Sequence, residues 1–171
     1  MNKVIEERTK RTEWYQNARF GMFIHWGLYA IPARGEWVRS FEEIPKEDYM
    51  KYFEEFDPVD YDPKKWARAA KEAGMQYVVL TAKHHDGFCL WPTETTTHSV
   101  LKAGNANGRA TNIPKDFAEA AHDLKMKYGF YVSPWDMNSA YWGDGTDNYA
   151  KKVFFPQCVE LAKYGADQFE M

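Results

Sequence analysis

Apolar residues recur along the chain in short uninterrupted runs that alternate with longer stretches of helical spacing. Residues 21–26 (GMFIHW) and 75–83 (MQYVVLTAK) are two such runs, and residues 130–134 (FYVSP) form a third. The second run is rich in β-branched residues, as are parallel strands that are covered on both faces. The pattern predicts three buried strands, and residues 168–171 (QFEM), which end at Met171, are expected to open a fourth buried strand.

Stretches with the apolar spacing of amphipathic helices separate these runs. One stretch has Asp62 for its N-cap, Pro63 in its first turn and Gly74 just past its end, and a later one opens at Pro114 and is expected to end at Gly129. The expected buried stripes are Trp66, Ala69, Ala70 and Ala73 in the first helix and Phe117, Ala120, Ala121 and Leu124 in the second. Two more helices are expected, over residues 45–56 with Tyr49, Phe53 and Phe56 on one face, and up to about Tyr164.

The order of the predicted elements defines the fold class. Strands alternate with helices, which is typical of an α/β protein with a parallel sheet. A complete (β/α)8 barrel takes about 250 residues and eight strands, whereas this chain of 171 residues supplies roughly half of those βα units. A flavodoxin-like sheet could stand at this length, but no Gly-rich phosphate loop follows the first strand. We therefore expect about the first half, four βα units, of a TIM-like barrel in residues 14–171, preceded by a polar lead-in over residues 1–13.

Composition narrows the classes of function. A net charge of −3 and a pI near 6.0 indicate no basic surface for nucleic acid. Cys89 and Cys158 show no zinc-finger or disulfide-scaffold spacing. We see no signal peptide and no apolar run of membrane-spanning length, so we expect a cytoplasmic protein without a membrane partner. Aromatic residues make up 17% of the chain, which suits a core and also a sugar site, because flat rings pack on the C–H faces of pyranoses.

Polar and aromatic side chains gather where the predicted strands end. In a parallel barrel the carboxyl ends of the strands meet on one rim, which carries the functional groups. The chain places these residues there: His25 and Trp26 after the first strand, Glu36 and Trp37 in the loop beyond it, His84, His85 and Asp86 after the second strand, and Tyr131, Ser133, Trp135 and Asp136 at the third. Such a rim predicts a binding site assembled from several strands.

Each of these residues also has a structural interpretation. A single histidine after an apolar run, such as His25, is more often a hydrogen-bonded core residue than a site residue. Trp135 could simply plug the end of the barrel. The adjacent pair His84 and His85 is harder to explain in this way, because two imidazoles are costly to bury without partners.

Two chemistries compete for this rim. In the first, imidazoles and carboxylates bind the vicinal hydroxyls of a sugar while indoles pack on its apolar face. In the second, His25, His84 and Asp86 hold a metal ion. His84 and Asp86 would share one face of an extended strand, but His85 would then point to the opposite face. The chain also lacks an H-x-H or H-E-x-x-H ligand pair, so the sequence favours the sugar site, and we expect no metal or other cofactor.

Four motifs resemble those of one enzyme family. They are residues 19–27 (RFGMFIHWG), 35–40 (GEWVRS), 71–91 (KEAGMQYVVLTAKHHDGFCLW) and 129–136 (GFYVSPWD). In this order they resemble the α-L-fucosidases of glycoside hydrolase family 29, from about Trp14 onward. The similarity is weaker over residues 93–112, and Met137 occupies a position that is associated more often with a basic residue.

The resemblance implies a (β/α)8-like catalytic domain that removes terminal α-L-fucose with retention of configuration. It also implies which residues contact fucose: His25, Glu36, Trp37, His84, His85 and Tyr131, with Trp135 beside them. In the family, the strand that matches QFEM continues into a Trp-Phe-Asp-Gly type sequence. The Asp of that sequence is the nucleophile and is expected just after Met171, and the acid/base carboxylate lies further on. By this alignment the chain contains neither carboxylate, and Glu36 and Asp136 are not substitutes for them.

These implications predict how the chain behaves. We expect a fragment that is inactive alone and whose partner is a fucosylated oligosaccharide or glycoconjugate. The alternative is a fucose-binding or complementing half-barrel subunit without catalysis. A half-barrel leaves open sheet edges at its first and last strands, and such edges recruit a second copy or a complementary C-terminal half.

Overall fold

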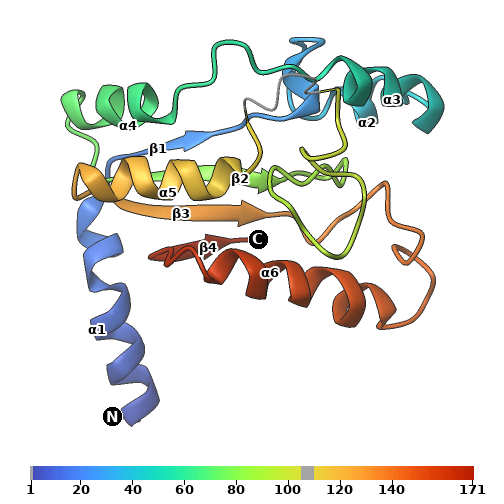
Figure 1. The fold of residues 1–171 in the computed structure, drawn as a ribbon. Coiled ribbons are helices and arrows are strands. Elements are labelled where there is room, and N and C mark those ends of the chain that lie inside the picture. Colours follow the sequence, from blue (N-terminus) through green and yellow to red (C-terminus); the bar gives the residue numbers. More distant parts are fainter. Residues whose placement is uncertain (1, 105–109) are drawn as a thin grey trace.

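A four-stranded parallel sheet forms the centre of the molecule (Figure 1). The computed structural model describes residues 2–104 and 110–171. The strands are β1 (Gly21–Ile24), β2 (Tyr77–Lys83), β3 (Lys127–Val132) and β4 (Gln168–Glu170), and they lie side by side in chain order. Tyr77 stands opposite both Gly21 and Lys127, and Gly129 stands opposite Gln168. The predicted α/β class and parallel sheet are therefore confirmed.

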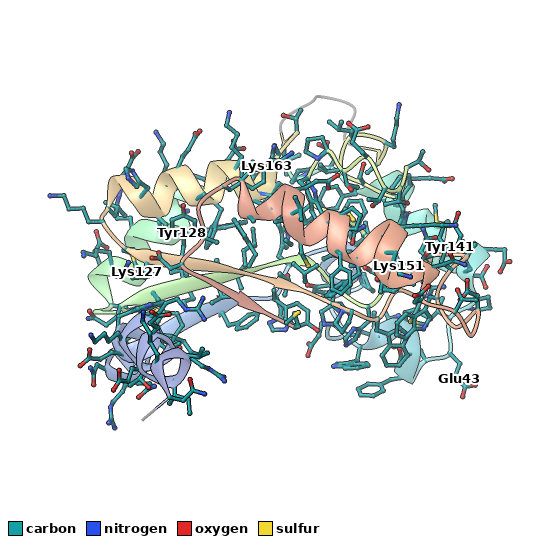
Figure 2. All side chains as sticks on the ribbon, turned by 90° about the horizontal axis from the view of Figure 1, so that it is seen from below. Glu43, Lys127, Tyr128, Tyr141, Lys151 and Lys163 are labelled. Carbon is teal, nitrogen blue, oxygen red and sulfur yellow. The ribbon has the colours of Figure 1, made fainter. Side chains whose placement is uncertain are left out.

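Helices connect these parallel strands and cover the sheet. α4 (Pro63–Glu72) and α5 (Ile113–Asp123) contact each other and the sheet, and α6 (Phe155–Ala162) precedes β4. Figure 2 shows α5 and α6 on the same side of the sheet. The cap predicted for α4 is confirmed, because the Asp62 side chain accepts a hydrogen bond from the backbone N–H of Lys65 at 3.0 Å.

The remaining helices lie at the two ends of the sheet. The long N-terminal helix α1 (Lys3–Ala18) projects away from the sheet and has no buried residue. It runs through the expected boundary between residues 13 and 14, and its lack of an apolar stripe explains why the sequence pattern did not predict a helix there. At the carboxyl ends of the strands lie η1 (Leu28–Ala30), α2 (Val38–Phe41), α3 (Lys46–Glu55) and the π-helical turn η2 (Ala150–Phe154). Within the described residues, no helix is long and apolar enough to cross a membrane.

Two helix details differ from the sequence prediction. The expected end of α5 at Gly129 is wrong, since the helix ends at Asp123 and Gly129 lies inside β3. Lys125 instead adopts the left-handed conformation, with φ +54°, between the helix and the strand. The sequence did not indicate this turn, because the residue in the left-handed conformation is a lysine and not the glycine that usually occupies such a position.

The buried stripe of α4 is rotated from the expected one. Ala69 and Ala73 are exposed, whereas Ala67 and Ala70 are buried. Two stripes with the same spacing fit this alanine-rich helix, because alanine is equally compatible with the core and with the surface. The stripe that contacts the neighbouring elements is the one that contains Ala67.

The first strand is shorter and more open than expected. It ends at Ile24 rather than Trp26, and the Phe23 side chain is 44% exposed. β1 pairs with β2 on one side and forms an edge of the described sheet. An edge strand lacks the neighbours that its apolar sequence would otherwise bury, so the expectation of a buried strand is wrong here.

The last strand also departs from the expectation of burial, at Met171. β4 ends at Glu170, and Met171 follows it outside the strand with 72% of its surface exposed. The expectation that residues 168–171 form a buried strand through Met171 is therefore wrong at this residue. The physical reason is the same as for β1: within the described sheet, β4 pairs with β3 alone, so its far side has no neighbour to cover an apolar side chain.

The loop between β2 and α5 contributes much of the core. Phe88, Cys89, Leu90 and Trp91 are all buried, and Cys89 forms isolated bridges with Lys83 and Ser99. The expected loop over residues 86–112 is present where described, and residues 105–109 of it lie outside the described residues. Because this loop packs against the end of β2, it fixes the chain that follows the strand.

Candidate functional site

The two adjacent histidines form the centre of the rim. β2 ends at Lys83, and the rings of His84 and His85 follow with their centroids 4.2 Å apart and their planes at 45°. The expectation that these rings point to opposite faces is wrong, because side chains alternate only while the backbone stays in a strand. The turn after Lys83 therefore brings both imidazoles to the same place.

The first and third strands bring two more rings to this pair. The His25 ring lies 5.7 Å from that of His84, measured between centroids. The Tyr131 ring lies 5.9 Å from His84 and 6.3 Å from His25. Since these residues belong to three neighbouring parallel strands or the segments that follow them, the register of the sheet assembles this part of the site.

Two indoles flank the histidine pair. The Trp37 ring lies 4.3 Å from His85 and 6.0 Å from His84, measured between ring centroids. Trp135 lies 5.1 Å from His85 and 5.8 Å from Trp37. The loops after β1 and β3 thus meet over His85, and all six aromatic and imidazole side chains predicted for the site are brought together.

The surroundings keep the central imidazoles neutral. Burial, together with the neighbouring His85 and His25, lowers the pKa of His84 to about 3. Burial also lowers the pKa of His85, while the Glu36 carboxylate acts in the opposite direction. A neutral imidazole has one N–H donor and one bare nitrogen acceptor, so at pH 7 each ring offers both to a ligand or a neighbour.

Three other residues predicted for the rim point elsewhere. Trp26 stacks on Tyr61, with centroids 5.8 Å apart and planes at 4°, and packs against the core as a partly buried side chain. Asp86 is buried, accepts hydrogen bonds from the Tyr49 hydroxyl at 3.0 Å and from the backbone N–H of Phe88 at 3.0 Å, and has its pKa raised to about 6 by burial. The third residue is Asp136, which is part of a buried network.

Met171 lies at the carboxyl end of the fourth strand. It follows Glu170, which stands opposite Tyr131 in the register of β3 and β4. Its exposed thioether side chain has no acid–base group, so Met171 itself supplies no catalytic function. The nucleophile that the resemblance implies just after Met171 stays a prediction.

The metal alternative gains no support from the placement of Asp86. Both of its carboxylate oxygens already accept hydrogen bonds inside the protein. Among the residues that the structure describes, no group of three or more His, Cys, Asp or Glu side chains is arranged to hold a metal ion. The described rim is therefore built from imidazoles, indoles, a phenol and Glu36.

A buried network that the sequence did not reveal lies next to these rings. The fully buried Lys83 donates to the Tyr149 hydroxyl at 2.7 Å and to the Gln157 side-chain oxygen at 2.8 Å. Its Nζ also lies 3.5 Å from Oδ2 of Asp136. A lysine that closes an apolar strand was the one available signal, because the partners lie more than 50 residues further along the chain.

Tyr29 was also missed by the sequence reasoning. Its ring lies 5.1 Å from that of His84, and its hydroxyl lies 3.0 Å from Oγ1 of Thr81. Burial raises the pKa of this phenol. Tyr29 is in the short helix η1, which has no periodic signal, and its contact with the His84 ring exists only in the folded chain.

The assembled rim can recognise a polyhydroxylated ring. Neutral imidazoles, a phenol and a carboxylate supply both donors and acceptors to hydroxyl groups. Indoles supply flat apolar faces beside them. The described carboxylates Asp86 and Asp136 are buried in other interactions, so neither of them is available to a ligand at this rim.

Comparison with known sequences and structures identifies a single family. The family model for alpha-L-fucosidase matches residues 2–169, and the chain therefore belongs to the α-L-fucosidase family of glycosidases. The resemblance seen in the four motifs is thereby confirmed. Among curated relatives, the putative alpha-L-fucosidase 1 of Oryza sativa subsp. japonica is 42% identical over 153 residues, which are 88% of this chain and 27% of the relative.

Solved structures lead to the same family. Alpha-L-fucosidase isoenzyme 1 from Paenibacillus thiaminolyticus is 48% identical, with a TM-score of 0.74 over 86% of this chain and 35% of that one. The alpha-L-fucosidase AlfC from Lactobacillus casei, in complex with its alpha-L-fucose product, is 28% identical, with a TM-score of 0.77 over 91% of this chain and 59% of that one. The chain thus spans about a quarter of the rice relative and about a third of the Paenibacillus structure.

Proposed function

We propose that this chain carries the fucose-binding part of an α-L-fucosidase catalytic domain. The single observation that supports it best is the convergence of rings from three strands and their loops on His84 and His85, beside Glu36. In the proposal, the imidazoles and the carboxylate bind the hydroxyls of fucose, and Trp37 and Trp135 pack on the apolar parts of the sugar. The substrate class is terminal α-L-fucose on an oligosaccharide or glycoconjugate.

The architecture that we propose for the complete domain is a (β/α)8 barrel. The chain would form its first four βα units, with β1 to β4 as consecutive barrel strands. The parallel sheet in chain order and the helices between its strands support this proposal. The similarity to fucosidase structures also supports it, since this chain covers 35% of one such structure and 59% of another.

We infer that hydrolysis needs groups that these residues do not supply. A retaining glycosidase uses two carboxyl groups about 5–5.5 Å apart, one as nucleophile and one as acid/base. Of the three carboxylates predicted for the rim, Asp86 and Asp136 are buried and bonded to other groups, which leaves Glu36. One carboxylate cannot perform both roles, so the chain alone is expected to bind fucose without cleaving fucosides.

An assay with an aryl α-L-fucoside tests this inference. The purified chain should release no aryl alcohol above the uncatalysed rate. Turnover that disappears in Glu36→Gln or Asp136→Asn would contradict the proposal, since it would make one of these carboxylates a catalytic residue. Lys151→Met, at an exposed position on η2, is a control for contaminating enzyme because it should leave any measured rate unchanged.

A second candidate function is complementation through the open side of the sheet. Phe23 on the edge strand β1 is 44% exposed, and Phe155 and Val159 on α6 are 58% and 62% exposed. These apolar side chains and the edge strands β1 and β4 fit a complementary half-barrel or a second copy of this chain. Size-exclusion chromatography tests the second copy directly: a concentration-independent monomer would exclude self-association through these edges.

A further inference from the structure

Ser133 makes a short polar contact with one of the site histidines. Its hydroxyl oxygen lies 2.6 Å from Nδ1 of His85, and the side chain is fully buried. One of the two partners must donate a proton in this contact. Which one donates decides what the other nitrogen of His85, Nε2, presents to a ligand.

Backbone hydrogen bonds hold both residues in place. The N–H of Ser133 donates to the carbonyl of Lys83 at 3.0 Å, which continues the pairing of β3 with β2 by one residue. The carbonyl of His85 accepts a hydrogen bond from the N–H of Met137 at 2.8 Å. The contact between Ser133 and His85 is therefore set by the sheet and by the loop that follows β3, rather than by free rotation of a surface side chain.

The other partners of the hydroxyl decide the direction of the proton. Ser133 Oγ lies 2.8 Å from the carbonyl oxygen of Trp135, which can only accept, and 3.0 Å from the N–H of Trp135, which can only donate. A serine hydroxyl has a single proton. With that proton directed to the Trp135 carbonyl, the contact with His85 requires an N–H on Nδ1. The Ser133 hydroxyl also interacts with the Tyr131 side chain and acts to lower the pKa of that phenol, as a donor to the phenol oxygen does. Whether the single proton is directed to the Trp135 carbonyl or to Tyr131, Nδ1 of His85 must be the donor in its contact with Ser133.

We propose that Ser133 is a positioning residue that fixes His85 as the Nδ1–H tautomer and leaves Nε2 as a bare hydrogen-bond acceptor. The ligand group that suits a bare Nε2 is an O–H donor, as on a sugar. This last step rests on the proposed fucose-binding function, whereas the tautomer does not. Trp135 takes part twice, because its peptide groups orient the hydroxyl and its indole lies against the His85 ring.

The ring has little freedom to turn away from Ser133. Trp37 and Trp135 contact it from the two loops, and His84 lies 4.2 Å away between centroids. Burial lowers the pKa of His85, so the neutral form, in which the two nitrogens differ, is the one present at pH 7. A neutral ring with a fixed tautomer presents one defined face to a ligand instead of an average of two.

Nitrogen NMR of the histidine-labelled chain measures this tautomer without any sugar. Long-range proton–nitrogen correlations at pH 7 are expected to show a protonated Nδ1 and a bare Nε2 for His85. His85→Gln assigns the signals by their disappearance. A protonated Nε2, or an average of both tautomers, would overturn the proposal, because Ser133 would then donate to the ring or fix nothing.

Variants of Ser133 separate positioning from simple packing. Ser133→Ala should convert His85 to a mixture of tautomers and weaken L-fucose binding about tenfold, the equivalent of one hydrogen bond. Ser133→Thr keeps the hydroxyl and should restore the single tautomer. Ser99→Ala, at another buried serine outside the site, should change neither the tautomer of His85 nor the affinity for L-fucose. An unchanged tautomer in Ser133→Ala would overturn the proposal.

The outcomes also distinguish this inference from the proposed function. If Ser133→Ala fails to fold, the tautomer of the wild-type chain and of Ser133→Thr still decides the matter. If the wild-type tautomer is the expected one but L-fucose does not bind, the positioning by Ser133 stands and the proposed fucose site is wrong. If fucose binds while His85 is an average of both tautomers, the proposed fucose site stands and the positioning by Ser133 is wrong.

Discussion

The ammonium group of Lys83 lies 3.5 Å from the Asp136 carboxylate, and the two side chains are 0% and 3% exposed. Lys83 immediately precedes the histidine pair, and Asp136 immediately follows Trp135. This ion pair therefore joins the end of β2 to the loop after β3, next to the rings of the site. Asp136 further accepts hydrogen bonds from the N–H groups of Asn138 and Ser139, at 3.0 and 2.9 Å.

Removing one member of this pair should destabilise the chain strongly. Lys83→Met leaves the buried Asp136 carboxylate without its cation, and we expect a loss of about 3–5 kcal/mol in the free energy of unfolding. Lys151 (Figure 2) is exposed and forms an i,i+4 ion pair with Asp147, so Lys151→Met should cost less than about 1 kcal/mol. Chemical denaturation followed by circular dichroism measures both.

The double variant Lys83→Met/Asp136→Asn completes the thermodynamic cycle. Because it removes both charges together, its loss should be smaller than the sum of the two single losses. Additive losses would show that the two groups do not stabilise each other, and would contradict the role given to this pair.

Gly87 should tolerate no side chain, for a reason specific to this site. Its φ is +78°, and a Cβ atom there would lie 2.2 Å from Oδ1 of Asp136. Gly143 has nearly the same φ, +77°, but a Cβ there meets nothing within 4 Å. Gly143→Ala should therefore cost only the left-handed backbone strain, about 1 kcal/mol.

Gly87→Ala carries that strain and must also displace Asp136. We expect a drop in melting temperature clearly larger than that of Gly143→Ala, together with shifted NMR signals of His85 and Trp135. Equal effects of the two substitutions would mean that the approach of Gly87 to Asp136 has no energetic importance.

Acid should destabilise the chain through a histidine that the sequence did not single out. His98 is buried against Phe53, with ring centroids 4.9 Å apart and planes at 23°, and burial lowers its pKa to about 4. The unfolded chain takes up this proton near pH 6.5 and the folded chain only near pH 4, so stability falls as the pH decreases through this window. At pH 5 the loss relative to pH 7 is about 2 kcal/mol from this group.

Two other buried groups act in the same window. His84, with its pKa lowered to about 3, adds to the loss, whereas Asp86, with its pKa raised to about 6, stabilises the fold as it is protonated. The drop in melting temperature from pH 7 to pH 5 should be smaller for His98→Phe than for the wild-type chain. Val59→Ala, at an exposed position, removes no titratable group and is the control that should leave the pH dependence unchanged. An equal pH dependence in His98→Phe would contradict a neutral buried His98.

The sequence predicted those parts of the fold that depend on local pattern. The continuous apolar run of β2 and the Asp62–Pro63 start of α4 have signals within a few residues. Gly129 misled the prediction because glycine has two uses, and here it lies in a strand while Lys125 makes the turn. The alanine-rich surface of α4 misled it because alanine does not distinguish buried from exposed positions. Met171 misled it because an apolar side chain is buried only where a neighbouring element covers it.

The candidate site was predicted by residue but not by geometry. Strand order alone places His25, His84 and Tyr131 on one rim. The alternation rule failed for His85, since it describes strands and β2 had already ended. The contacts of Lys83 and Ser133 could not be predicted, because each depends on partners that only the folded sheet brings near.

A titration of the histidine- and tryptophan-labelled chain with L-fucose tests the central claim most directly. Its mirror image, D-fucose, is the control, because it has the same groups in the opposite handedness. We expect L-fucose to shift the signals of His25, His84, His85 and Trp37 saturably, with little change at the distant His122, and His84→Ala to abolish the effect. No saturable shift, or equal shifts with D-fucose, would contradict the assignment of this rim as a fucose site.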